Sequence, residues 1–213
     1  MGMFSKIKEH IYSFNEKIWM NRIRKNNKNK NFTLITNNCI GGVIYHNLGM
    51  EFTSPTINLF IRTDEYVNFC RNLSVYTHCE MIEDTESDMA YPVGILIPEN
   101  GEYPPVHVHF QHYPDFKTAK EKWITRCQRI HYENIYFLME YYGSIYDSKY
   151  AVEFDNLPLK TMVLLHNPMN QIKDAFVLHC YKDDKPLARV IEKRGISGKR
   201  YLDEFDYVKF LNS

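Results

Sequence analysis

The sequence predicts a mixed α/β fold, with helices on the faces of a mixed β-sheet and a separate amphipathic helix in front of it. Helical and strand-like segments alternate only in part along the chain, which favours a mixed sheet over a purely parallel one. The run NIYFLMEY at 134–141 is almost wholly apolar, as in a strand buried on both faces. Near the N-terminus, apolar residues recur at three- and four-residue steps, which is the period of a helix face.

Length and composition indicate one globular domain. The chain has 213 residues, of which 44% are hydrophobic and 15% aromatic, enough for a well-packed core. The net charge is zero, but residues 1–31 carry eight Lys or Arg against two Glu. Because the basic excess is confined to this arm, nucleic acid is not expected as a partner.

The cysteines and the hydropathy pattern predict a cytoplasmic location. Five Cys are scattered without a CxxC pair, which is neither a disulfide framework nor a zinc motif. There is no signal-peptide layout and no apolar run long enough to span a membrane. Neither GxGxxG nor GxxxxGK[ST] occurs, so no nucleotide cofactor is predicted.

Residues 1–24 form the predicted amphipathic helix, whose apolar positions include Ile7, Ile11, Phe14 and Ile18. Lys and Arg flank this stripe, so the helix could pack on the domain, on a second copy, or on an anionic membrane surface at the inner face. The polar stretch KNNKNKN at 25–31 reads as a linker. Residues 32–213 then form the single α/β domain.

Periodicity and turn residues divide this domain into elements. We expect Thr63 or Asp64, and Asp115, to begin helices, and Gly49 to end one. Strands are expected at 32–36, 78–83, 91–98, 105–112, 134–141, 160–166 and 175–181; helices are expected at 40–48, 63–73, 115–131, 149–156 and 201–211, with a surface loop or hairpin at 182–200.

The most informative stretch is FTLITNNCIGG, which reads as strand, tight turn and helix, with Cys39 at the helix start. A thiol there faces unpaired N–H groups and the positive end of the helix dipole. Both favour the thiolate and are expected to lower the thiol pKa. The alternative is a buried structural cysteine beside a turn.

A second informative stretch is VHVHFQH, which ends at His112 before a Tyr-Pro-Asp turn. His107 and His109 share one strand face, but no third ligand motif stands nearby, so no metal site is predicted. A histidine at a strand end facing a cysteine at a helix start is the arrangement of papain-like enzymes. The sequence therefore suggests a Cys39–His112 pair.

These residues also carry a family resemblance. The run TNNCIGGVIYHNLGMEFTSPTINLFI, followed by YVNFCRNL, YPVG, FQHYPDFKTAKEKWITRCQRI and NIYF, resembles the domain of unknown function 1919 family. The resemblance runs from about Phe32 to Leu165; Ile40 replaces the usual aromatic after the cysteine. Members are often labelled exopolysaccharide biosynthesis proteins, which implies a role in making bacterial capsule or lipopolysaccharide glycans.

The pattern also resembles, more weakly, a family of papain-like cysteine peptidases. That family too has an early cysteine, a histidine-containing strand end and a helix with paired arginines. In this chain those features are Cys39, His112 and the Arg126/Arg129 pair.

The resulting hypothesis is an enzyme that transfers or hydrolyses an acyl group on a glycan, or on a nucleotide- or lipid-linked sugar. Cys39 would be the nucleophile, His112 the general base, and Glu140 or Asn134 the group that orients the base, with Glu140 preferred. The expected substrate-binding residues flank the turn, the Pro55 loop and one helix: Asn37, Asn38, Gly41, Ser54, Arg126 and Arg129. The arginines would hold a phosphate or an acidic sugar; the alternative is a solvated helix face paired with Glu121 or Glu133.

Two other functions remain open at this point. The many Tyr and Trp residues also suit a non-catalytic carbohydrate-binding or accessory protein of the same pathway. A glycosyltransferase would be favoured by a DxD motif, whereas the chain has only Asp183-Asp184 and Glu83-Asp84.

Overall fold

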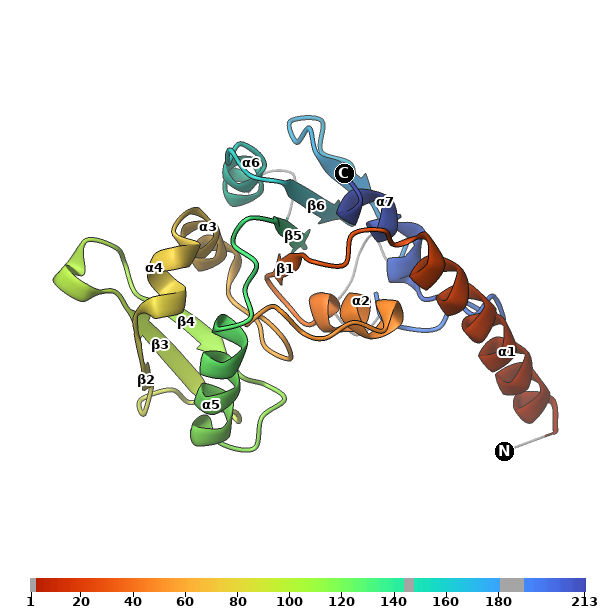
Figure 1. Ribbon diagram of the computed structural model, residues 1–213, viewed down its shortest axis with the longest axis horizontal. Helices are drawn as coiled ribbons and strands as arrows, with labels where there is room; N and C mark the ends of the chain where they lie inside the picture. Colours follow the sequence, from red (N-terminus) through yellow and green to blue (C-terminus); the bar gives the residue numbers. More distant parts are fainter. Residues whose placement is uncertain (1–2, 144–147, 181–189) are drawn as a thin grey trace.

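The computed structural model describes residues 3–143, 148–180 and 190–213 (Figure 1). Its main sheet has four parallel strands in the order β1-β5-β6-β7. They are β1 (Thr33–Thr36), β5 (Ile135–Tyr141), β6 (Thr161–Leu165) and β7 (Ala175–Val177). The apolar run at 134–141 is an interior strand, as predicted.

A second sheet is antiparallel and has three strands, in the order β2-β3-β4. They are β2 (Glu80–Glu83), β3 (Val93–Ile97) and β4 (Val106–His109). Short connections let antiparallel strands pair with their neighbours in sequence, whereas parallel strands need longer crossovers. The mixed α/β fold is confirmed, with its parallel and antiparallel strands in two sheets.

The helices follow the predicted order, with α4 as an addition. They are α1 (Met3–Asn26), α2 (Ile40–Leu48), α3 (Thr63–Arg71), α4 (Leu73–His78), α5 (Phe116–Cys127), α6 (Lys149–Asp155) and α7 (Tyr207–Leu211). Short 3₁₀ turns cover Glu99–Gly101 and Tyr201–Glu204, so the predicted helix at 201–211 is divided in two. The strand predicted at 175–181 ends at Val177. The last residue of that predicted range and the first half of the loop predicted at 182–200 lie outside the described residues.

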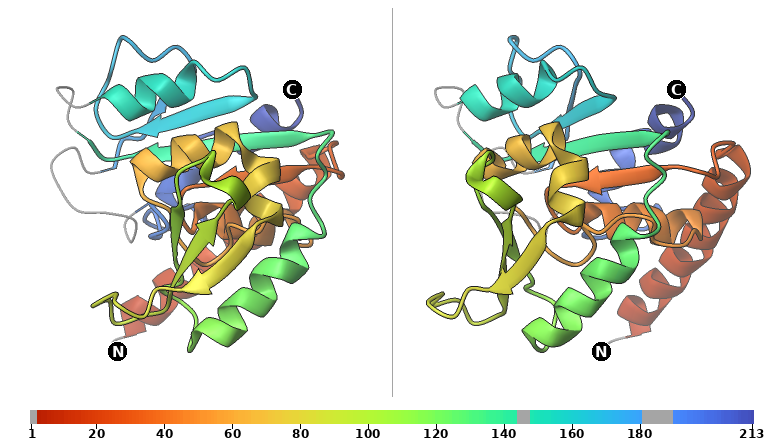
Figure 2. Two further views of the ribbon diagram at one scale, coloured as in Figure 1. Left: turned by 90° about the vertical axis from the view of Figure 1, so that its left-hand side faces the viewer. Right: turned by 60° about the vertical axis from the view of Figure 1, so that its left-hand side comes forward.

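Each face of the main sheet has its own core. Alternate side chains such as Ile35 and Phe137 pack with α3, α6 and the small sheet. The intervening side chains, such as Leu34 and Leu138, pack with α2, the end of α1 and the C-terminal segment. The small sheet, α3, α4 and α5 therefore lie on one side of the molecule, and α1 and α7 on the other (Figures 1 and 2).

The segment predicted as a linker is tied to the domain. Helix α1 continues to Asn26, and Ile23 is buried in the same core as Phe32. Beyond the helix, the Asn29 side chain donates to the Leu211 carbonyl at 2.7 Å, and the Asn134 side chain donates to the Asn31 carbonyl at 2.7 Å. Residues 27–31 thus connect the helix to both the C-terminal segment and β5.

Candidate functional site

Polar side chains gather at the carboxyl edge of the main sheet, on the face covered by α2. Asn37 and Asn38 follow β1, Glu140 lies near the end of β5, and His166 comes directly after β6. Because strand side chains alternate, Asn38, Glu140 and His166 share the face that carries Leu34, Leu138 and Leu164. In open α/β sheets, ligands bind beyond the carboxyl ends of the strands.

Glu140 and His166 form a buried ion pair. The Glu140 residue is fully buried, and its Oε1 lies 3.0 Å from His166 Nε2. Burial lowers the pKa of His166, but hydrogen bonds with Cys180 and Glu140 outweigh this effect and raise the pKa to about 10. His166 is therefore protonated at neutral pH and neutralises the carboxylate.

The two asparagines join β1, β5 and α2. Asn37 donates from Nδ2 to the Glu140 carbonyl and accepts the Glu140 N–H at Oδ1, both at 2.9 Å. Asn38 donates to Glu140 Oε2 at 2.8 Å and accepts the Ile40 N–H at 3.0 Å. Both side chains are buried and occupied by these bonds, so they build the turn that carries Cys39.

Cys39 is the N-cap residue of α2 and is partly buried. Its thiol accepts a hydrogen bond from Gln111 Nε2 at 3.3 Å and donates one to the Leu59 carbonyl at 3.7 Å. Burial raises the pKa of the Cys39 thiol, and the bond from Gln111 offsets only part of this effect. The expected lowering of the pKa is wrong because desolvation prevails and Asn38 already occupies the Ile40 N–H at the helix start.

Cys39 and His112 line the same surface cavity, whose volume is about 490 Å³. The other described residues that line it are Gly42, Val43, His46, Phe52, Asn58, Ile191 and Arg200. None of these nine residues is acidic. Arg200 brings a positive charge, part of which is offset by Glu16 of α1, whose carboxylate lies 3.9 Å from the guanidinium. The cavity therefore suits a ligand with an anionic group.

Glu140 was expected to orient His112, but in the structure it bonds to other residues. Its two carboxylate oxygens accept from His166 and Asn38. Asn134, the other candidate, lies at the start of β5, where it bonds to Asn29 and Asn31. The structure thus brings Cys39 and His112 together in one cavity and assigns neither candidate as a third member.

Gly41 and Ser54 lie inside the protein. A Cβ atom on Gly41 would be 2.7 Å from Thr36 Oγ1, so glycine permits the close approach of α2 to β1. Ser54 is fully buried, with its hydroxyl 3.0 Å from that of Thr56. In this structure both residues serve the packing of the turn and the loop.

Arg126 of α5 and Arg129, two residues beyond the end of that helix, hold the loop that follows α2; the helix predicted at 115–131 ends at Cys127. The Arg126 guanidinium donates to the Ile57 carbonyl at 3.2 Å and to the Tyr113 hydroxyl. Arg129 lies 3.0 Å from the Glu51 carboxylate, so its ion-pair partner differs from the expected Glu121 or Glu133. The loop that they fix contributes Phe52 and Asn58 to the Cys39 cavity.

His107 and His109 have separate environments. His107 Nδ1 lies 2.7 Å from the Glu65 carboxylate, while His109 stacks on Phe60 with ring centroids 4.3 Å apart. Within the described ranges, no group of three or more His, Cys, Asp or Glu is placed to hold a metal ion.

Three residues of this region were not identified as site residues from the sequence. His166 ends the predicted strand 160–166, much as Glu140 lies near the end of 134–141, and this shared position was the available signal. Gln111 directly precedes His112. Asn58 has a φ of +61°, a left-handed conformation that asparagine tolerates better than most residues; no local pattern pointed to it.

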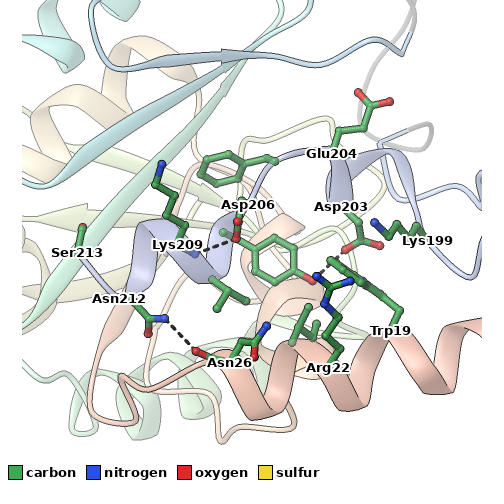
Figure 3. Close-up of a pocket in the computed structure, with 14 residues that line it drawn as sticks. Trp19, Arg22, Asn26, Lys199, Asp203, Glu204, Asp206, Lys209, Asn212 and Ser213 are labelled. Atoms are coloured by element: carbon green, nitrogen blue, oxygen red, sulfur yellow. Dashed lines mark hydrogen bonds between the residues drawn. The ribbon is translucent and has the colours of Figure 1, made fainter.

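A second cavity, of about 730 Å³, lies between α1 and the C-terminal segment (Figure 3). Its charged lining is mixed: Arg22, Lys199 and Lys209 are basic, whereas Asp203, Glu204 and Asp206 are acidic. The Asp203 carboxylate accepts from the Tyr207 hydroxyl at 2.9 Å, and Asp206 caps α7 through the Lys209 N–H at 2.9 Å. No cysteine or histidine is among the described residues that line it, so the Cys39 cavity is the better candidate for covalent chemistry.

Comparison with known proteins places the chain in a family. The model described as "Domain of unknown function (DUF1919)" matches residues 11–212. A protein of Haemophilus influenzae, described as an uncharacterized protein, is 29% identical over 214 residues, which cover 100% of this chain and 99% of that protein. The family match extends beyond the expected range of 32–165, into α1 and through the C-terminal segment. The chain belongs to the DUF1919 family.

Proposed function

We propose that this protein is a bacterial enzyme of surface-glycan assembly that transfers or hydrolyses an acyl group through Cys39 and His112. The single observation that carries the proposal is that both residues line one solvent-accessible cavity at the start of α2. A nucleophile and its base must both reach the reacting group. A ligand bound in this cavity would lie against both residues.

The raised pKa of Cys39 determines what the first step of the reaction requires. Because burial favours the neutral thiol, the sulfur needs a base at the moment of attack. His112 would take the thiol proton while the sulfur bonds to the acyl carbon, which gives a tetrahedral oxyanion. The C–O bond would then break as His112 returns that proton to the leaving oxygen, which leaves a thioester on Cys39. Water or an acceptor hydroxyl would then cleave the thioester and restore the thiol.

Gln111 is the candidate donor for the negative charge that develops on the carbonyl oxygen. Its Nε2 already donates to the Cys39 sulfur at 3.3 Å, beside the carbon that would be attacked. At the start of α2, the N–H of Ile40 is already bonded to the Asn38 side chain. An amide donor held next to the nucleophile stabilises an oxyanion without adding charge.

The lining of the cavity supports an anionic substrate. Arg200 lines the same cavity as Cys39, and none of the described lining residues is acidic; nucleotide- and lipid-linked sugars carry phosphates. We therefore propose a phosphate-bearing sugar precursor as the substrate and the cytoplasm as the place of reaction.

The test is the surface-glycan composition of the bacterium that carries the gene, after replacing it with Cys39→Ser, His112→Gln and the double variant. If the residues act as one unit, all three should show the same loss. Cys79→Ser is the matched control, because Cys79 is also a partly buried free cysteine but lines another cavity. Normal glycan from a stably folded Cys39→Ser protein would refute the enzymatic proposal.

A non-catalytic carbohydrate-binding or accessory role is the second candidate. It is favoured by the two hydrogen bonds and the raised pKa of Cys39, which also fit a structural thiol. If the protein only binds a glycan, Arg200→Gln should change the surface-glycan composition as loss of the gene does. Cys39→Ser should leave that composition normal.

A further inference from the structure

Helix α1 has two apolar faces, and among the described residues only one of these faces meets the rest of the protein. The inner face includes Tyr12 and Ile23, which are buried. On the opposite side, an outer face is formed by Ile7, Ile11, Phe14 and Ile18, which are 49%, 39%, 65% and 54% exposed. At about 100° per residue, these four positions form one continuous stripe.

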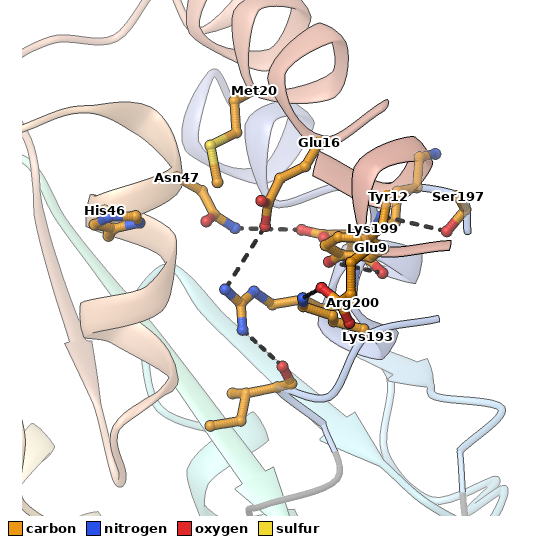
Figure 4. Close-up of polar contacts among 12 residues, drawn as sticks. Glu9, Tyr12, Glu16, Met20, His46, Asn47, Lys193, Ser197, Lys199 and Arg200 are labelled. Atoms are coloured by element: carbon orange, nitrogen blue, oxygen red, sulfur yellow. Dashed lines mark hydrogen bonds and ion pairs between the residues drawn. The ribbon is translucent and has the colours of Figure 1, made fainter. Parts of the chain in front are cut away.

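The inner face is fixed by polar contacts with residues 193–200 (Figure 4). Glu9 lies 2.8 Å from the Lys193 ammonium, and Glu16 lies 3.9 Å from the Arg200 guanidinium. The Asn15 side chain adds a bond to the Ile196 carbonyl at 2.7 Å. Glu9 and Glu16 are the only acidic residues within α1, so its negative charges are used on the inner side.

The charged side chains that flank the outer face of α1 are all basic. Lys8 and Lys17 are exposed and lie on opposite flanks of the stripe, and Lys25 continues it toward the end of the helix. The outer face thus combines four exposed apolar side chains with uncompensated cations.

This charge pattern distinguishes between two possible occupants. A second copy would bring the same basic flanks toward one another, with no acidic residue on either outer face to pair with them. An anionic bilayer offers both an apolar layer and negative headgroups, which attract basic residues near its surface. We propose that the outer face of α1 docks this protein, with the helix lying in the plane, on an anionic membrane surface.

The fold suits this geometry. Helix α1 lies at the edge of the molecule, and its N-terminal half extends away from the main sheet (Figure 1). No helix in the described part of the chain is long and apolar enough to cross a membrane, so contact would be peripheral. Since α1 is already ordered against residues 193–200, docking does not have to supply the free energy of helix formation.

The experiment is co-sedimentation of the full-length protein with vesicles of phosphatidylcholine, alone or mixed with phosphatidylglycerol. We expect binding to the mixed vesicles, with weak binding to phosphatidylcholine alone. High salt should weaken the binding, because it screens the lysine contacts. Equal binding to both kinds of vesicle, or to neither, would overturn the proposal.

Two variants locate the contact. Phe14→Ser with Ile18→Ser should lower the partition coefficient at least about tenfold; Ile82→Ser with Ile124→Ser is the control, at exposed apolar positions of β2 and α5. Lys8→Gln with Lys17→Gln should abolish the preference for the anionic lipid, whereas Lys117→Gln with Lys122→Gln on α5 should preserve it. Circular dichroism spectra would verify that each variant is folded.

The alternative occupant of the outer face, a second copy of the protein, predicts a different experimental result. If the outer face joins two copies, sedimentation velocity without lipid will show a dimer that the Phe14/Ile18 double substitution dissociates. That result, together with vesicle binding that the substitution leaves unchanged, would replace the membrane proposal by self-association.

Discussion

His166 Nε2 lies 3.0 Å from Glu140 Oε1, and the two residues are brought together from the carboxyl ends of neighbouring parallel strands. The side chains are 11% and 0% exposed. Removing two charges from water is costly, and the Asn38 amide and the Cys180 carbonyl offset part of that cost by bonding to the pair. The pair therefore depends on both partners being present.

The first prediction concerns the loss of one partner. Glu140→Gln should lower the free energy of unfolding by about 3–5 kcal/mol, because it leaves His166 without its buried counter-ion. The double variant with His166→Gln should recover part of this loss, and urea unfolding would measure both. Equal destabilisation by the single and double variants would show that the charges are not coupled.

The same pair predicts a pH dependence. Because the pKa of His166 is raised from 6.5 to about 10 in the folded protein, its contribution to stability is complete below pH 6.5 and is lost as the pH rises through 10. The stability difference between wild type and His166→Gln should therefore shrink between pH 7 and pH 10. A constant difference over this range would contradict a raised pKa.

His109 predicts the opposite dependence, on the acid side. Burial and the nearby Arg62 lower its pKa from 6.5 to about 4. Between these values the unfolded chain binds a proton that the folded protein does not, so acidification should cost up to about 3 kcal/mol. His109→Phe should retain the stacking on Phe60 and flatten this slope in urea unfolding from pH 7 to pH 4. An unchanged slope would show that other groups control acid unfolding.

Gln111 should control the reactivity of Cys39. Gln111→Leu removes the bond that partly offsets the burial of the thiol, so the pKa of Cys39 should rise further. The pH profile of iodoacetamide labelling, followed by mass spectrometry, should move to higher pH. Cys79 in the same protein is the internal control, and a profile unchanged at Cys39 would refute the role of the amide.

Arg126 of α5 and Arg129, just beyond that helix, should differ in their effect on stability. Arg126→Met removes donors to the Ile57 carbonyl and the Tyr113 hydroxyl, and should cost about 1–3 kcal/mol. Arg129→Met breaks an ion pair with Glu51, whose side chain is 68% exposed, and should cost at most about 1 kcal/mol. Thermal unfolding of the two variants would compare them; a reversed order would contradict the assignment of Arg126 as the main contact with the loop.

Local signals in the sequence predicted most of the elements. Gly49 ends α2 in a left-handed conformation with a φ of 65°, and Asp115 caps α5 by accepting the Thr118 N–H at 2.7 Å. Helix caps and helix ends depend on a few neighbouring residues, so they can be predicted from the local sequence pattern. Cys39 lies at the helix start that the pattern predicts, but β4 ends at His109, so His112 lies in the turn after the strand and not at its end.

Contacts between distant residues could not be predicted in this way. Glu140 and His166 are 26 residues apart, and their meeting depends on the register of β5 and β6. The pKa of Cys39 depends on how deeply the loop around Leu59 and Gln111 buries it. Both properties arise from tertiary packing, which no local pattern in one sequence specifies.

The bonds of Asn38 also constrain how this family can evolve. Its side chain donates a hydrogen bond to the Glu140 carboxylate and accepts one from the Ile40 N–H, so the residue must be a donor and an acceptor at once. Aspartate at position 38 would set a second carboxylate against Glu140, and leucine would leave both partners unbonded. Positions 38, 140 and 166 should therefore covary among relatives, with a change at one accompanied by changes at the others.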